Sequence, residues 1–235
     1  MAPHSSSLVS IGIPALAVAV VALVGLAVWR TSDERRALGF ASAVAAWFAF
    51  SAALGASGFL AHFEGFPPRL LVLLVPTVAL PFALGFSRLG TALASAPLAA
   101  LVGFHAFRLP LELVMHQATL EGVMPEQMTY TGNNFDIVTG ATALVVGALA
   151  ARDLAPRWLL VGWNAVGSLL LINILVIAVV SLPAFGAFGH TPERLNTWVA
   201  YFPFVWLPAG LVSAAVLGHV LLWRRLLAHG MRGPR

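Results

Sequence analysis

Residues 8–29 read LVSIGIPALAVAVVALVGLAVW and contain no charged side chain. A helix of this length measures about 33 Å at about 1.5 Å per residue, which is enough to cross the roughly 30 Å hydrocarbon core of a bilayer. The run is too long for the apolar part of a secretion signal, no basic stretch precedes it, and Arg30 follows it. We expect a retained membrane-spanning helix rather than a cleaved signal.

The composition of the whole chain agrees with this reading. Of its 235 residues, 60% are hydrophobic and 9% are charged, whereas a soluble domain carries about 25% charged residues. So few charged side chains cannot cover a surface that faces water. The composition therefore predicts an integral membrane protein and leaves no room for a soluble catalytic domain.

Further apolar runs, cut where charged and turn residues return, predict an all-α fold. The chain is expected to form a single domain, residues 1–235, that is a bundle of seven transmembrane helices. The fourth span contains an arginine and a glutamate, and the fifth is short. The predicted spans are residues 8–29, 37–61, 70–86, 91–118, 133–151, 158–182 and 197–223.

The arginines predict the orientation of the bundle. Only Arg69 and Arg194 lie between spans on one side, and ten arginines lie on the other. Because basic residues gather on the cytoplasmic side, the amino terminus is predicted outside and the carboxyl terminus in the cytoplasm. All 13 basic residues are arginine, and with the abundant Ala, Gly, Leu and Val this is typical of a GC-rich bacterial genome. The expected location is the inner (plasma) membrane.

Residue types that the chain lacks exclude several kinds of chemistry. The sequence has no cysteine, which removes disulfides, thiolate metal ligands and thiol nucleophiles. It has no lysine, so a retinal Schiff base is excluded. No basic cluster with interleaved aromatic residues is present, so nucleic acid is not an expected partner. The lipid bilayer is the expected environment, and any other cofactor stays open.

A polar stripe on the fourth span is the most informative feature for function. His105, Arg108, Glu112 and His116 fall within an arc of about 80° on a helix. An unpaired arginine or glutamate at the centre of a bilayer costs about 2.5–3.5 kcal/mol, so this face is expected to meet protein or water. On a continuous helix from Thr91, His105 lies about 20 Å from the cytoplasmic end, with the other three farther out.

The stripe and nearby polar residues predict an outward-facing pocket that is closed below by apolar side chains. Arginine offers a charged fork to an anionic group, and histidine titrates near neutral pH. We therefore expect the pocket to bind a small ligand or ion, with transport as one use. The predicted ligand-binding residues are His105, Arg108, Glu112, His116, Asn133 and Asp136.

Other interpretations of the stripe stay open at this point. Arg108 and Glu112 are four residues apart and can form an ion pair within the helix that serves structure alone. Glu112 and His116 have the same spacing and are candidate ligands for a metal ion, with further ligands from other segments. A haem between His105 and His219 is disfavoured, because His219 is placed nearer the cytoplasmic surface.

Three functional classes follow from these interpretations. The first is a binding or transport protein. The second is a membrane-embedded enzyme that acts on a lipid or small substrate from the outer leaflet, with Glu112 or His116 as general base or metal ligand. The third is a structural or accessory membrane subunit. The sequence does not name the ligand or the oligomeric state.

Overall fold

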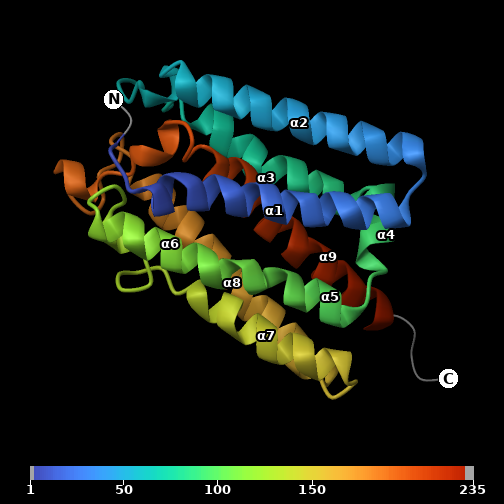
Figure 1. Ribbon diagram of the computed structural model, residues 1–235. Helices are drawn as coiled ribbons and strands as arrows, with labels where there is room; N and C mark the ends of the chain where they lie inside the picture. Colours follow the sequence, from blue (N-terminus) through green and yellow to red (C-terminus); the bar gives the residue numbers. More distant parts are fainter. Residues whose placement is uncertain (1–2, 231–235) are drawn as a thin grey trace.

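The computed structural model describes residues 3–230, and these residues form helices and connecting loops without any β-strand. The predicted all-helical class is confirmed. Most of the helices lie side by side with their long axes roughly aligned (Figure 1). At one end of this bundle, the arginine-rich end, Arg30 lies in the last turn of α1 (Ser7–Thr31), Arg35 and Arg36 lie in the first turn of α2 (Glu34–Ala56), and α4 (Arg88–Ala94) begins at Arg88. The loop that follows α6 lies at the other end, which we call the loop end.

The elements divide into long helices and short turns. The helices are α1 (Ser7–Thr31), α2 (Glu34–Ala56), α3 (Leu71–Phe86), α4 (Arg88–Ala94), α5 (Leu98–Gly103), α6 (Arg108–Leu120), α7 (Ile137–Ala151), α8 (Arg157–Val180) and α9 (Ser213–Gly230). The 3₁₀ turns are η1 (Phe59–Ala61), η2 (Phe104–Phe107), η3 (Glu126–Met128), η4 (Pro192–Arg194) and η5 (Trp198–Ala200), and η6 (Leu207–Val212) is a π-helical turn.

Among the described residues, five helical stretches are long and apolar enough to cross a membrane, by length and composition. A sixth is counted if α3 and α4, which meet at a bend of 76°, form one broken span. α7 has 15 residues, or about 22 Å, which is less than the roughly 30 Å hydrocarbon core. The five stretches are Ser7–Thr31, Glu34–Ala56, Leu98–Leu120, Arg157–Val180 and Leu207–Ala228.

The predicted fourth span, residues 91–118, is not one continuous helix. α4 ends at Ala94, and Pro97 is the cap residue in front of α5. A residue that precedes proline is disfavoured in the α conformation, so the chain breaks before Pro97 and starts again at Leu98. His105 is therefore only about 10 Å from the start of its helix, rather than the predicted 20 Å.

The predicted fifth and seventh spans begin too early. Asn134 Oδ1 accepts the backbone N–H of Asp136 at 3.0 Å, a local bond that competes with helix formation, and α7 starts only at Ile137. The seventh helix starts at Leu207 rather than residue 197. Pro203 lies in the preceding turn, and proline lacks the N–H that a helix interior requires.

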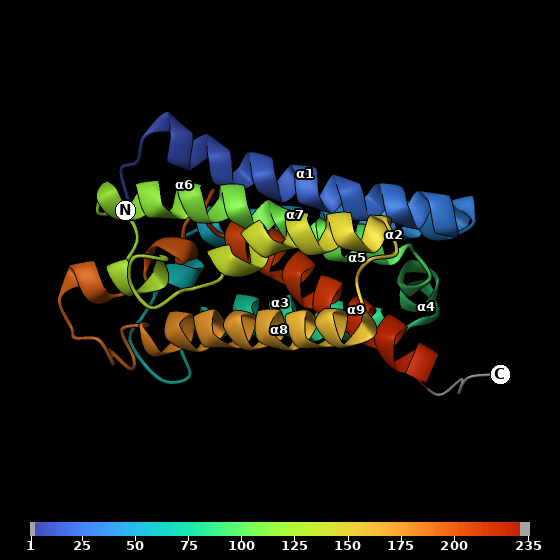
Figure 2. The same cartoon turned by 90° about the horizontal axis from the view of Figure 1, so that it is seen from below.

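α9 occupies the centre of the bundle. In Figure 2 it passes between a layer that contains α1, α6 and α7 and a layer that contains α3 and α8. The stretch Leu207–Ala228 is also the most buried of the candidate spans, whereas α2 is the least buried. α9 thus lies inside the bundle, and α2 lies at its edge.

Glycine allows the close contact between α7 and α6. A Cβ atom at Gly140 would collide with the backbone nitrogen of Leu109 and would lie 2.9 Å from the carbonyl carbon of Arg108. Backbone atoms cannot move aside as a flexible side chain can. Only glycine at position 140 therefore permits this approach, which brings the start of α7 against Arg108.

We expect Gly140→Ala to lower the thermal stability of the purified protein, because overpacking of a tight contact costs about 1–3 kcal/mol. The matched control is Gly162→Ala on α8, where an added Cβ meets no atom within 4 Å. The control should keep or slightly raise the melting temperature, since alanine is the better helix former. Equal melting temperatures for the two variants would contradict the assigned contact.

Candidate functional site: a buried charged cluster and a histidine pair

Four polar side chains form a buried cluster between α6 and the following loop. Arg108 and Glu112 come from α6, and Asn134 and Asp136 come from the α6–α7 loop, residues 121–136. The exposed fractions of Arg108, Glu112, Asn134 and Asp136 are 1%, 2%, 0% and 6%. We call these four residues the charged cluster.

Short polar contacts connect the members of the charged cluster. Arg108 Nη1 donates to Asp136 Oδ1 at 2.7 Å, which makes a buried ion pair. Asn134 Nδ2 donates to Glu112 Oε1 at 2.9 Å and to the carbonyl of Met128 at 3.1 Å. The loop therefore provides partners for both charged residues of α6.

The ion pair differs from the predicted one. The spacing of Arg108 and Glu112 allowed an ion pair within the helix, but Arg108 binds Asp136 and Glu112 accepts from Asn134. The reason is the path of the loop, which brings an acceptor to the guanidinium of Arg108 and a donor to the carboxylate of Glu112. No sequence spacing connects positions 108 and 136, although the polar run that begins at Asn133 pointed to this segment.

The charged cluster keeps unused hydrogen-bonding capacity. Arg108 Nε and Nη2 and Glu112 Oε2 are buried and have no hydrogen-bond partner in the structure. A buried polar atom without a partner costs about 1–3 kcal/mol. The cluster can therefore accept a further polar group that brings oxygen acceptors to Arg108.

A second polar group lies deeper in the bundle and consists of His105 and His219, the histidine pair. Their exposed fractions are 0% and 3%, and their ring centroids are 4.2 Å apart. His219 Nδ1 lies 2.7 Å from Asn164 Oδ1, and because an amide oxygen only accepts, Nδ1 carries the proton. His219 Nε2 is then an acceptor, and it has no partner in the structure.

Two glycines make room for the histidine pair. A Cβ atom at Gly218 on α9 would lie 2.7 Å from His105 Nε2, and one at Gly167 on α8 would lie 2.7 Å from His219 Cε1. The rings can therefore sit between α8, α9 and the turn η2. This packing has no counterpart in the predicted arrangement of the helices.

The predicted difference in depth between His105 and His219 is wrong. The break before Pro97 places His105 about 10 Å from the start of α5, and His219 lies about 8 Å before Arg224 near the arginine-rich end of α9. The two side chains are therefore at the same depth, and their rings are in contact.

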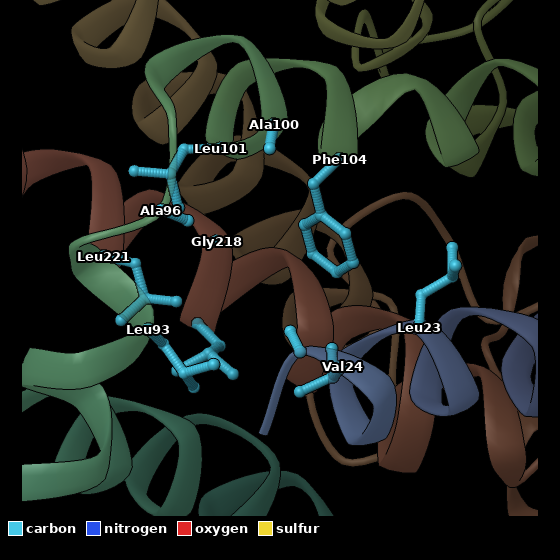
Figure 3. Close-up of a pocket in the computed structure, with 11 residues that line it drawn as sticks. Leu23, Val24, Leu93, Ala96, Ala100, Leu101, Phe104, Gly218 and Leu221 are labelled. Atoms are coloured by element: carbon cyan, nitrogen blue, oxygen red, sulfur yellow. The ribbon is translucent and has the colours of Figure 1, made fainter. Parts of the chain in front are cut away.

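The interior next to the histidine pair, toward the arginine-rich end, is apolar. A pocket of about 110 Å³ lies there, between α1, α4, α5 and α9. Figure 3 shows Phe104, Leu23, Leu93 and Leu221 around this pocket, with Gly218 at its wall. No ionisable side chain lines the pocket. The pocket therefore brings no charged group to the histidine pair.

The remaining predicted site residues lie outside the charged cluster. His116 is half-buried, its ring centroid is 4.7 Å from that of Tyr130, and its Nδ1 is 3.4 Å from Thr129 Oγ1. Asn133 is exposed, and its carbonyl accepts from Asn173 Nδ2 at 2.8 Å. The neighbouring Asn134, which was not among the predicted ligand-binding residues, takes the position in the cluster.

The metal hypothesis gains no third ligand from the structure. Within residues 3–230, no group of three or more His, Asp or Glu side chains is placed to hold a metal ion. Glu112 and His116 would supply two donors at most. Metal binding at this pair stays a prediction.

A surface contact ties the start of the α6–α7 loop to α1. Ser6 donates to the Glu121 carboxylate from its hydroxyl at 2.6 Å and from its backbone N–H at 2.8 Å. These bonds lower the pKa of Glu121 below its ordinary value. Because the depressed pKa favours the charged form, the contact holds at neutral pH and is lost as the pH falls through that pKa.

No protein-family model, curated protein or solved structure matches this chain.

We expect a double-mutant cycle to identify Asp136 as the partner of Arg108. Arg108→Leu or Asp136→Leu alone leaves an uncompensated buried charge, which costs about 3–5 kcal/mol, while replacement of both is close to neutral. The measurement is thermal unfolding of the two single variants and the double variant. A second cycle, with Arg108→Leu and Glu112→Leu, is the control and should show the weaker coupling. Stronger coupling to Glu112 would contradict the observed ion pair.

Proposed function

We propose that the chain is a seven-helix protein of a bacterial inner membrane that binds a small anionic ligand in its charged cluster and transports it. The ligand enters from the outer side. The observation that carries the proposal is the buried arginine whose ion-pair partner comes from a loop rather than from a helix.

Seven spans and the orientation are part of the proposal. α7 is short, but it runs back along α6 and α5 (Figure 1), and the buried residues of the preceding loop add to its length. With α7 and the bent pair of α3 and α4, the five candidate spans become seven. The excess of arginines at one end supports a cytoplasmic carboxyl terminus.

Asp136 stands in the position that an anionic ligand would take. A ligand carboxylate or phosphate can accept from Arg108 Nη1 in its place and can also reach Nε and Nη2, which have no acceptor in the structure. Two parallel bonds from a guanidinium to two oxygens are stronger and more specific than one. The ligand therefore compensates for the loss of Asp136.

The α6–α7 loop controls access to the charged cluster. All four cluster residues are almost fully covered in the described conformation, so a ligand reaches Arg108 only when the loop lifts. Movement of the loop removes Asn134 and Asp136 together, because the Asp136 N–H donates to Asn134 Oδ1. In the conformation with the α6–α7 loop lifted, the charged cluster forms the predicted outward-facing pocket.

The ligand site is tested by thermal shift of the purified protein with acetate, phosphate and sulfate as probes. A ligand that binds only the folded state stabilises it by RT ln(1 + L/Kd), where L is the ligand concentration, so the melting temperature rises with that concentration. We expect at least one probe to raise the melting temperature of the wild type and to act at lower concentration on Asp136→Asn, which removes the competing charge. Arg108→Leu with Asp136→Leu should show no shift. If no probe stabilises the wild type or Asp136→Asn, the cluster is structural, as expected for an accessory subunit.

The orientation is tested by labelling of single cysteines with an impermeant maleimide on intact cells. Thr131 in the loop and Arg35 at the arginine-rich end are both exposed, and the chain has no native cysteine. We expect Thr131→Cys to react and Arg35→Cys to react only after the cells are opened. The reverse pattern would invert the proposed orientation.

A further inference from the structure

Two pockets near the arginine-rich end share one lining residue. The first, the basic pocket, has a volume of about 340 Å³ and is lined by Arg36, Arg88, Ser32 and Ser87, among others. The second, the apolar groove, has a volume of about 280 Å³ and lies between α1, α2, α3 and α9. Phe40 lines both, so the groove adjoins the basic pocket at this side chain.

The charge of the basic pocket comes from two exposed guanidinium groups. Arg36 lies in the first turn of α2, and Arg88 is the first residue of α4. Arg36 Nε is 3.3 Å from Asp33 Oδ2, and its side chain is 63% exposed. The Ser32 and Ser87 hydroxyls donate to carbonyls of the helices that precede them, α1 and α3. An anion in the pocket would therefore be held by Arg36 and Arg88.

The wall that carries Arg88 is fixed by α9. Arg224 donates to the carbonyl of Gly85 and, from Nη2, to Thr91 Oγ1 at 2.8 Å. Its guanidinium carbon lies 5.5 Å from the centre of the Phe86 ring. These contacts hold the bend between α3 and α4, so Arg88 is presented from an anchored segment.

The apolar groove offers little hydrogen bonding to an occupant. Trp47 Nε1 donates to the carbonyl of Ala209 at 3.0 Å, and Ser213 Oγ donates to the carbonyl of Thr77 at 3.0 Å. The polar side-chain atoms of the lining residues are thus used inside the protein. From Phe40 to Trp47 the groove follows α2 for about 10 Å.

We propose that the basic pocket and the apolar groove together bind one anionic phospholipid. Its phosphate lies between Arg36 and Arg88, and an acyl chain fills the groove. Basic pockets between transmembrane helices are suited to anionic lipid head groups. Of the elements that line the groove, α1, α2 and the stretch Leu207–Ala228 are each long and apolar enough to cross a bilayer. A free phosphate would fill only the basic pocket and leave the groove unexplained. The site shares no residue with the charged cluster, so it does not depend on the proposed transport function.

The head-group contact is tested by native mass spectrometry of the detergent-purified chain titrated with phosphatidylglycerol. We expect one lipid to bind each chain and Arg36→Gln with Arg88→Gln to weaken binding about thirtyfold, since each arginine near an anionic lipid contributes a factor of about five. The control, Arg30→Gln with Arg35→Gln, removes two exposed arginines at the same end outside the pocket and should bind as the wild type does. Phosphatidylcholine with the same acyl chains should bind more weakly.

The acyl-chain contact is tested separately by filling the groove. Ala43 lines the groove, whereas Ala45 is exposed on the same helix outside it. Ala43→Phe should weaken binding of phosphatidylglycerol at least fivefold and Ala45→Phe should not, with melting temperatures showing that both are folded. Four outcomes would each overturn the proposal. In the head-group test, these are an equal loss of affinity in the two double-arginine variants, equal binding of phosphatidylcholine, and no lipid bound to the wild type. In the acyl-chain test, it is unchanged binding of phosphatidylglycerol by Ala43→Phe.

Discussion

The ion pair between Arg108 and Asp136 constrains the structure around α6 and α7. A guanidinium that is 1% exposed is tolerated in an apolar bundle only when an opposite charge and hydrogen bonds compensate for its lost hydration. The carboxylate must reach 2.7 Å from Nη1, which fixes the end of the α6–α7 loop and the start of α7. Gly140 permits the approach of the two backbones, and Asn134 joins Glu112 to the same loop.

Much of the fold could be predicted from the sequence because it depends on local properties. Apolar runs place the ends of α1, α3 and α8 within two residues of their observed positions, since composition decides which segments avoid water. Helical periodicity also identified the buried face that carries His105, Arg108 and Glu112. The breaks were missed where proline or a polar side chain interrupts an apolar run, at Pro97 and before Leu207.

The contacts of the candidate site could be predicted only in part, because they join distant segments. Asp136 was expected to bind ligand, but its pairing with Arg108 depends on the three-dimensional path of the loop. Asn134 rather than Asn133 belongs to the charged cluster because the loop turns the Asn134 side chain toward the protein interior. The contact between His105 and His219 could be predicted only with the correct start of α5. A continuous helix from residue 91 places this start about seven residues, or about 10 Å, too early.

In the proposed function, Arg108 holds Asp136 in the closed conformation and exchanges it for an anion. Solid-state NMR can measure the dipolar coupling between ¹⁵N-labelled arginine side chains and ¹³C-labelled aspartate carboxylates. An Asp33→Asn background removes the surface pair with Arg36. We predict a coupling between the Arg108 side-chain nitrogen and the Asp136 carboxylate carbon, because Nη1 lies 2.7 Å from Oδ1, and we expect this coupling to decrease when the stabilising anion is added. The absence of this coupling in the anion-free protein, or a coupling that the anion leaves unchanged, would contradict the account.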